Sequence, residues 1–367
     1  MRERQRPLAI DVICAAVLPA IQGSLPEEVS TELDLDPSEV RRVLAGIHQR
    51  GRDELGLNLP RISKRTRERL SAAYRVGQLT IAHMAASSLD PFAKFVCSSG
   101  DGELFECVRI PLERAGRFSV CVSSQIGCAL GCQFCHTGGL GLVRNLAAWE
   151  IVEQVRVVRR TLGSDDRLAG VVFQGMGEPL ANLDAVIRAI RVLSDPCGQC
   201  VDQKAITVCT AGLPQALRRL TEARLRVRVG LSIGSARPEL RRELMPIELR
   251  FSLDESIEAL IAHTKATRQS PMLAYTLIGG INTHTEDAGA LRDLAIRVGR
   301  ESGRMPRLSL IPYNPRGPED PFRRADEVEA EQFRLRLIDA GFPVVRRYSG
   351  GADISAACGQ LAARLGA

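Results

Sequence analysis

Six short apolar runs, each followed by a longer amphipathic segment, fill the sequence after residue 118 and constrain the fold more than any other feature. The expected strands are residues 119–123, 170–174, 205–209, 227–233, 272–278 and 307–311. The expected helices are residues 147–161, 183–194, 213–221, 253–267, 285–302 and 326–340. This alternation indicates an α/β fold with a parallel sheet, either doubly wound or curled into a partial barrel.

The sequence before residue 91 has a different pattern and predicts a helical accessory domain at residues 1–90. Apolar residues recur at helical spacing from Ile10 to Ile21 and again from Val40 to Ile47. Ten arginines and lysines lie between Val40 and Gly77, against three acids. Such a cluster could neutralise the phosphates of a nucleic acid such as RNA, although basic helical faces are also commonly just solvated.

Two short apolar runs follow, on either side of the turn at residues 98–102. They predict a β-hairpin linker at residues 91–118. Residues 119–367 are then expected to form the barrel, with a catalytic segment at the C-terminal end.

The charge and the cysteine content indicate a cytoplasmic protein with an anionic partner. The net charge of +6 is only mildly basic, so it supports an anionic partner without identifying one. The eleven cysteines are an odd number, and no signal-peptide pattern precedes them. No apolar run is long enough to cross a membrane. We therefore expect reduced thiols in the cytoplasm, available for metal binding or catalysis.

Three of these cysteines are closely spaced directly after the first expected barrel strand. Cys128, Cys132 and Cys135 have the spacing Cys-x3-Cys-x2-Cys. A structural zinc site normally has four ligands, whereas three thiolates can hold three irons of a four-iron cluster and leave the fourth iron open. The alternative is a zinc site in which His136 supplies the fourth ligand. We expect His136 to be a loop residue beside a [4Fe-4S] cluster instead.

This cysteine spacing at the end of a first barrel strand resembles the radical S-adenosylmethionine superfamily. Further motifs resemble the RlmN/Cfr family of RNA adenine methyltransferases within it. They are residues 121–125 (Cys-Val-Ser-Ser-Gln), 144–146 (Arg-Asn-Leu), 175–182 (Gly-Met-Gly-Glu-Pro-Leu-Ala-Asn) and 355–361 (Ser-Ala-Ala-Cys-Gly-Gln-Leu). The resemblance runs from about residue 90 to residue 365 and implies a partial (β/α)6 barrel. It also implies one cluster per chain and two molecules of S-adenosylmethionine per turnover.

The resemblance assigns the cofactor site residue by residue. Cys128, Cys132 and Cys135 match the cluster ligands. The residues that match positions contacting S-adenosylmethionine are Gly177, Glu178, Cys209, Ser232, Ile233, Gly234 and Asn314. Two of them depart from the family pattern: a cysteine replaces serine at Cys209, and a glycine replaces histidine at Gly234. Without an imidazole at Gly234, cofactor binding there is expected to depend on backbone groups.

The same resemblance implies three catalytic residues. Cys358 matches the cysteine that first accepts a methyl group and then carries it to the base, because the adenine ring carbons have no lone pair for ordinary methyl transfer. Cys121 matches the cysteine that releases the product by forming a disulfide with Cys358. Glu106 matches the acceptor of the ring proton. The segment between Pro111 and Cys121 is two residues longer than the family usually has, which affects the alignment of Glu106.

The expected substrate is an adenosine in 23S ribosomal RNA, methylated at carbon 2, with transfer RNA as a further substrate. The target base has to leave its stack, at a cost of roughly a few kcal/mol. An electron donor such as flavodoxin or ferredoxin is the other expected partner. Three alternatives remain open: methylation at carbon 8, a radical enzyme of the same fold with another substrate, and a non-catalytic RNA-binding protein with a structural metal. Cys197 and Cys200 form a further Cys-x2-Cys pair, which we expect to be a loop without function.

Overall fold

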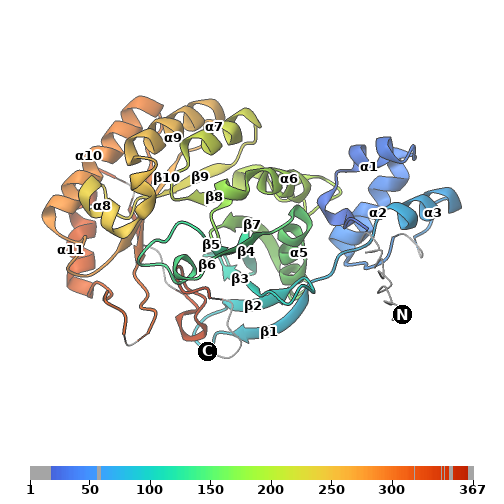
Figure 1. Ribbon diagram of the computed structural model, residues 1–367, viewed down its shortest axis with the longest axis horizontal. Coiled ribbons are helices and arrows are strands. Elements are labelled where there is room, and N and C mark those ends of the chain that lie inside the picture. The colour runs from blue at the N-terminus through green and yellow to red at the C-terminus, as the bar shows by residue number, and fades with distance from the viewer. Residues whose placement is uncertain are drawn as a thin grey trace, which may run out of the picture.

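The computed structural model describes residues 18–55, 59–317, 319–339, 341–342, 344–346 and 350–362. Within these residues one ten-stranded sheet forms the body of the protein (Figure 1). Its strands, in spatial order, are β1 (Thr80–Ala86), β2 (Ala93–Ser98), β3 (Phe105–Pro111), β4 (Arg117–Val122), β7 (Arg167–Phe173), β8 (Ile206–Thr210), β9 (Arg228–Ser232), β10 (Met272–Leu277), β11 (Arg307–Pro312) and β12 (Val344–Arg346). Pairing is antiparallel from β1 to β4 and parallel from β4 to β12.

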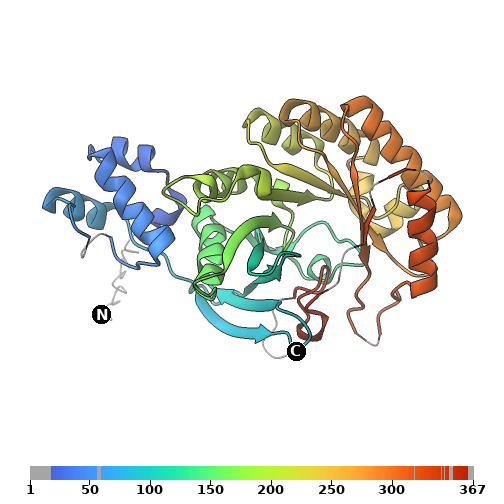
Figure 2. The same cartoon turned by 180° about the vertical axis from the view of Figure 1, so that it is seen from behind.

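Helices cover the outer face of the parallel strands (Figures 1 and 2). They are α5 (Ala148–Arg159), α6 (Leu183–Ser194), α7 (Pro214–Glu222), α9 (Leu253–Thr267), α10 (Thr285–Ser302) and α11 (Glu327–Ile338). The short helix α8 (Pro238–Leu244) packs instead against the loop that carries Cys132 and Phe134. Side-chain caps start two of them, because Ser252 accepts a hydrogen bond from the backbone N–H of Glu255 and Asp326 from that of Glu329. The prediction of an α/β barrel with six strand–helix units is confirmed. The sequence pattern had not indicated α8 or the short strand β12.

The segment expected as a linker is part of the main sheet. β2 and β3 form the expected hairpin, with Val96 opposite Glu106. However, β1 pairs with β2, and β3 pairs with β4, so the hairpin continues the barrel sheet. β1 also lies within residues 1–90, where only helices were expected. Its residues are mostly exposed on this edge strand, so no apolar alternation marked it in the sequence.

In the described part of the N-terminal accessory domain there are three α-helices: α1 (Pro26–Glu32), α2 (Pro37–Arg50) and α3 (Lys64–Ala73). They pack around a small apolar core of their own. The first part of the expected helix from Ile10 to Ile21 lies outside the described residues. The domain joins the barrel through α5 and α6, where Arg188 pairs with Glu28 at 2.6 Å and Arg156 donates to the carbonyl of Ile47.

In the parts of the chain that the structure describes, no helix combines the length and the apolar character that crossing a bilayer requires.

The C-terminal segment lies against the protein, beside β1 and β2 (Figure 2). There Asp353 accepts a hydrogen bond from the backbone N–H of Ser88 at 3.0 Å.

Candidate active site

The three motif cysteines lie on a loop at the carboxyl end of β4. A short strand, β5 (Gln125–Cys128), pairs with β6 (Gly141–Asn145), and the loop between them contains the helix α4 (His136–Gly139). Cys128 ends β5, and Cys135 is the residue before α4. Gly127 allows the two strands to approach, because a Cβ there would lie 1.8 Å from the carbonyl oxygen of Gly141.

The thiols of this loop are buried enough to disfavour charge in the absence of a cation. Burial raises the pKa of Cys128 to about 11 and also raises the pKa of Cys132 and Cys135. Negative charge on Cys135 and Cys128 raises the pKa of Cys132 further, so the three groups are close neighbours. Bound iron would reverse this preference, because a coordinating thiol is deprotonated.

The three thiols of this loop can each bind a separate iron of a cluster. Among the described residues, no three His, Cys, Asp or Glu side chains converge closely enough to surround one metal ion. An iron–sulfur cluster distributes its thiolates over separate irons, so its ligands need not converge on one point. Three neighbouring thiols on one loop therefore suit a four-iron cluster. The backbone N–H of His136 donates to the carbonyl of Gly359, which places His136 beside the C-terminal segment.

Gly177 and Glu178 follow β7 and lie next to the cysteine loop. Gly177 has a φ of 95°, and a Cβ there would lie 2.5 Å from the Cβ of Gln125, so the close approach requires glycine. The carboxylate of Glu178 is buried and accepts hydrogen bonds from the backbone N–H groups of Ala211 and Leu180. Burial raises the pKa of Glu178, and these N–H groups oppose that rise. Its charge also contributes to the raised pKa of Cys128.

Ser232 is the last residue of β9, and Ile233 and Gly234 follow it at the carboxyl end of the strand. Gly234 has a φ of 66°, and a Cβ there would lie 2.5 Å from the sulfur of Met245. At this position the glycine therefore fits both the backbone conformation and the close packing. Cys209, near the end of β8, is buried and lies 3.5 Å from the side-chain oxygen of Gln174.

Arg241 is a buried cation that the sequence did not single out. Its guanidinium donates to the carbonyl oxygens of Ser232, Ile233 and Ala211, and it pairs with Glu248 at 2.8 Å. Arg241 thereby links the segment that follows β8 to the segment that follows β9. An arginine in a polar helical segment has no sequence signal that separates it from its exposed neighbours.

The C-terminal segment contacts the cysteine loop and the end of β11. The side-chain nitrogen of Asn314 donates to the carbonyl of Cys358 at 3.1 Å. The hydroxyl of Thr137 donates to the carbonyl of Leu361 at 2.7 Å. Cys358 itself is exposed, whereas Cys121 on β4 is buried.

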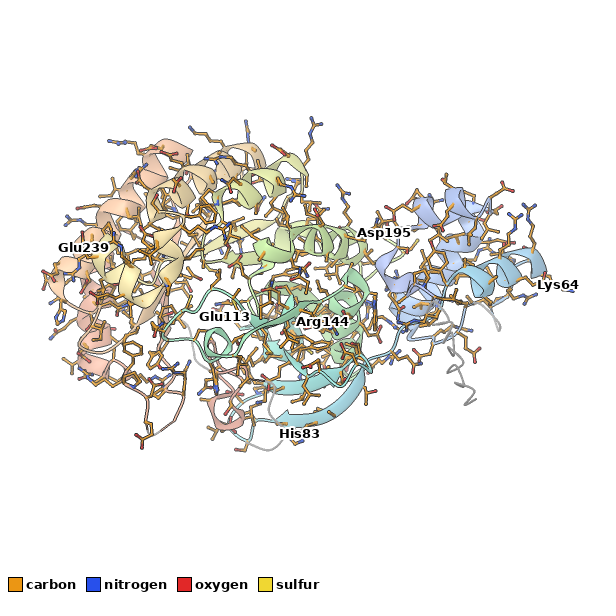
Figure 3. The ribbon with its side chains drawn as sticks, in the orientation of Figure 1. Lys64, His83, Glu113, Arg144, Asp195 and Glu239 are labelled. Atoms are coloured by element: carbon orange, nitrogen blue, oxygen red, sulfur yellow. The ribbon has the colours of Figure 1, made fainter. Side chains whose placement is uncertain are left out.

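A cavity of about 540 Å³ brings several candidate residues together. Cys121, Cys135 and Cys358 all line it, and so do Gln174 and Gly175. Most of its other lining residues are apolar, apart from a few polar groups such as Glu113 (Figure 3). The candidates outside this lining are Glu106, Cys128, Cys132, Gly177, Glu178, Cys209, Ser232, Ile233, Gly234 and Asn314.

Glu106 is buried beside this cavity and has a partner that the sequence analysis missed. Lys94 lies 3.2 Å from its carboxylate, and the backbone N–H of Ala362 donates to the other carboxylate oxygen at 2.9 Å. The lysine within the apolar run of β2 was the sequence signal for this ion pair, because a buried lysine requires a partner.

Cys197 and Cys200 lie in a turn beside α2, where the amide of Gln49 contacts Cys200 and the turn backbone.

Known proteins resemble this chain over most of its length. The model of the radical SAM superfamily matches residues 122–294. A probable RNA methyltransferase of Sorangium cellulosum is 48% identical over 362 residues, covering 92% of this chain and 91% of the relative. The dual-specificity RNA methyltransferase RlmN of Syntrophobacter fumaroxidans is 42% identical, covering 76% of this chain and 78% of the relative. The crystal structure of a radical SAM methyltransferase from Sphaerobacter thermophilus matches with a TM-score of 0.83 at 31% identity, covering 94% of this chain and 100% of that chain.

Proposed function

We propose that this chain transfers a methyl group through Cys358 to carbon 2 of an adenosine. The chain belongs to the RlmN/Cfr family of radical S-adenosylmethionine RNA methyltransferases. The protein is an enzyme of that class and uses a [4Fe-4S] cluster and S-adenosylmethionine. We further propose 23S ribosomal RNA as its substrate, with transfer RNA as a second one. The observation that supports this most is the cavity lined jointly by Cys121, Cys135 and Cys358.

The residues around this cavity suit the two cofactors. Cys128, Cys132 and Cys135 would hold the cluster, and Gly177, Glu178, Cys209, Ser232, Ile233, Gly234 and Asn314 would contact S-adenosylmethionine. When bound, the cofactors supply a methyl cation equivalent and a 5′-deoxyadenosyl radical. Glu178 would present a buried negative charge to the cofactor's amino group, and backbone groups at Gly234 would replace a side-chain contact.

Cys358 has the position and the exposure for the first chemical step. As a thiolate it would displace the methyl group from the sulfonium and become S-methylcysteine. Loss of a hydrogen atom from this methyl group would leave a carbon radical on Cys358, which adds to carbon 2 of the adenine. This route avoids ordinary methyl transfer to a carbon that has no lone pair.

Glu106 and Cys121 would complete the reaction. Val108 and Ile110 line the cavity, and Glu106 shares their face of β3 because alternate residues of a strand point to the same side. The radical adduct would also have to lose one electron, which an oxidised [4Fe-4S] cluster can accept, and Glu106 would accept the proton that leaves carbon 2. Cys121, as a thiolate, would then attack the sulfur of Cys358, so that a disulfide forms while the bond from that sulfur to the base's carbon breaks and this carbon takes up a proton to become the methyl group.

The accessory domain would place the RNA. Its helix α3 carries Lys64 at the tip farthest from the barrel (Figure 3), where this side chain is 84% exposed and lies 3.7 Å from Glu68. Several arginines of the domain are paired with acids, such as Arg65 with Asp34 and Arg41 with Glu27. The contribution to phosphate binding would therefore come from part of the basic cluster. A flavodoxin or ferredoxin as electron donor, and a cytoplasmic location, complete the proposal.

Anaerobic reconstitution with iron and sulfide tests the proposal on the purified protein. We expect a brown protein with about four irons per chain, as three cysteine ligands and an open iron imply. After incubation with S-adenosylmethionine, the peptide that contains Cys358 should gain the mass of one methyl group, and added 23S RNA should gain 2-methyladenosine. Formation of 8-methyladenosine would assign the enzyme to the carbon 8 reaction. An unmodified Cys358 in a protein with an intact cluster would contradict the proposal.

A further inference from the structure

We propose that Lys94 is a positioning residue, which holds the carboxylate of Glu106 toward the chain segment that carries Cys358. The inference rests on the proposed role of Glu106 as proton acceptor. It adds to that role the residue that fixes the carboxylate in place.

The ion pair is enclosed by the protein. The side chains of Lys94 and Glu106 are 7% and 1% exposed, and the ammonium nitrogen lies 3.2 Å from one carboxylate oxygen. Lys94 is opposite Val108 in the register of β2 and β3, and Glu106 is opposite Val96, so the two charged side chains are diagonal neighbours on one face of the hairpin. In this dry setting a buried carboxylate needs a counter-charge, so the ammonium of Lys94 helps to fix where the carboxylate of Glu106 lies.

The pair also contacts the C-terminal segment on both sides of Cys358. The ammonium of Lys94 donates to the carbonyl of Ser355 at 3.4 Å, three residues before Cys358. The second carboxylate oxygen of Glu106 accepts from the N–H of Ala362 at 2.9 Å, four residues after Cys358. One buried ion pair thus sets the distance between the proposed base and the segment that delivers the methyl group.

Hydrogen bonds that do not involve Lys94 also hold the segment around Cys358 in place. Asn314 donates to the carbonyl of Cys358, the N–H of His136 donates to the carbonyl of Gly359, and Thr137 donates to Leu361. Methylation of the Cys358 thiol needs this thiol and the cofactor, but it needs no base at Glu106. Loss of Lys94 should therefore affect the transfer to RNA much more than the methylation of Cys358.

The test follows the two half-reactions separately in reconstituted full-length enzyme. The variants are Lys94→Met, which removes the charge at similar length, and Lys94→Arg, which keeps it. Lys265→Met, at an exposed position of α9, is the matched control. Each protein is assayed for iron content, for methylated Cys358 by peptide mass, and for methyladenosine in a single turnover with an RNA fragment.

We expect Lys94→Met to methylate Cys358 within about twofold of the wild type and to lose at least about tenfold in the rate of transfer to RNA, as misplacement of a general base implies. Lys94→Arg should recover most of that loss. Wild-type transfer by Lys94→Met would overturn the inference. Equal loss of both half-reactions together with the cluster would also overturn it, because it would assign Lys94 a purely structural role. If the wild type itself left Cys358 unmethylated, the proposed function would fail instead.

Discussion

The side-chain amide of Asn314 donates a hydrogen bond of 3.1 Å to the carbonyl oxygen of Cys358. Its oxygen in turn accepts from Arg324 at 3.2 Å, which fixes the orientation of the amide. The loop after β11 thereby positions the backbone of the residue that we propose to carry the methyl group. The expected contact of Asn314 with the cofactor stays a prediction, and the bond that the structure shows joins Asn314 to the backbone of Cys358.

Replacing Asn314 by Asp should slow methylation of Cys358. Asp presents an oxygen to the carbonyl of Cys358 in place of a donor, and loss of such a partly buried hydrogen bond costs about 0.5–1.5 kcal/mol. We expect the rate of Cys358 methylation, followed by peptide mass, to fall about tenfold with unchanged iron content. An unaltered rate would show that the bond has no part in presenting the thiol.

Replacing Glu178 by Ala should weaken binding of S-adenosylmethionine. The carboxylate is buried and satisfies the N–H groups of Ala211 and Leu180, so its loss removes both a charge for the cofactor and the order of the loop. We expect the dissociation constant, measured by equilibrium dialysis on reconstituted enzyme, to rise at least about tenfold, as loss of a charged hydrogen bond implies. Asp184→Ala, at an exposed position of α6, should bind like the wild type. Equal affinity of Glu178→Ala and the control would contradict the assignment.

Replacing Arg241 by Met should destabilise the barrel. The substitution leaves Glu248 buried without its cation and leaves three backbone carbonyls without this donor. We expect the free energy of unfolding, from denaturant titration, to fall by about 3–5 kcal/mol, whereas Arg242→Met on the exposed side of α8 should change it by less than about 0.5 kcal/mol. Similar values for the two variants would show that the buried guanidinium contributes little.

His48 should make the protein less stable in mild acid. Burial lowers the pKa of His48 from 6.5 to about 3, with a further contribution from Arg156, and neither ring nitrogen has a hydrogen-bond partner among the described residues. Below pH 6.5 the unfolded chain gains a proton at this ring while the folded chain does not, so stability is present above that pH and is lost as the pH falls.

Between pH 7.5 and 5.5, the wild type should lose about 1 kcal/mol of unfolding free energy more than His48→Leu. Urea titration at both pH values measures this difference. His83→Leu is the control, because this side chain is exposed on the edge strand β1 (Figure 3). If His48→Leu and the wild type lost equal stability, the ring would not be buried as a neutral group.

Local patterns predicted most of the barrel but not the contacts between distant segments. The six strand–helix units and the cysteine loop depend on short-range periodicity and spacing, which one sequence displays directly. β1 was not predicted, because an exposed edge strand needs no apolar alternation. The pairing of Lys94 with Glu106 depends on the register of the β2–β3 hairpin, and the bond from Asn314 to Cys358 joins residues 44 apart in sequence. Only the folded sheet brings them together, so spacing alone could not reveal them.

Nucleoside mass spectrometry of total RNA tests the central claim most directly. A host strain that lacks its own adenine carbon methyltransferase would express either the wild-type chain or Cys358→Ala, at matched protein and iron levels. We predict that 2-methyladenosine appears with the wild type and is absent with Cys358→Ala, because in the proposed reaction the thiol of Cys358 carries the methyl group to carbon 2. Equal amounts of 2-methyladenosine from both proteins would contradict the account, since the methyl group would then reach the base without passing through Cys358.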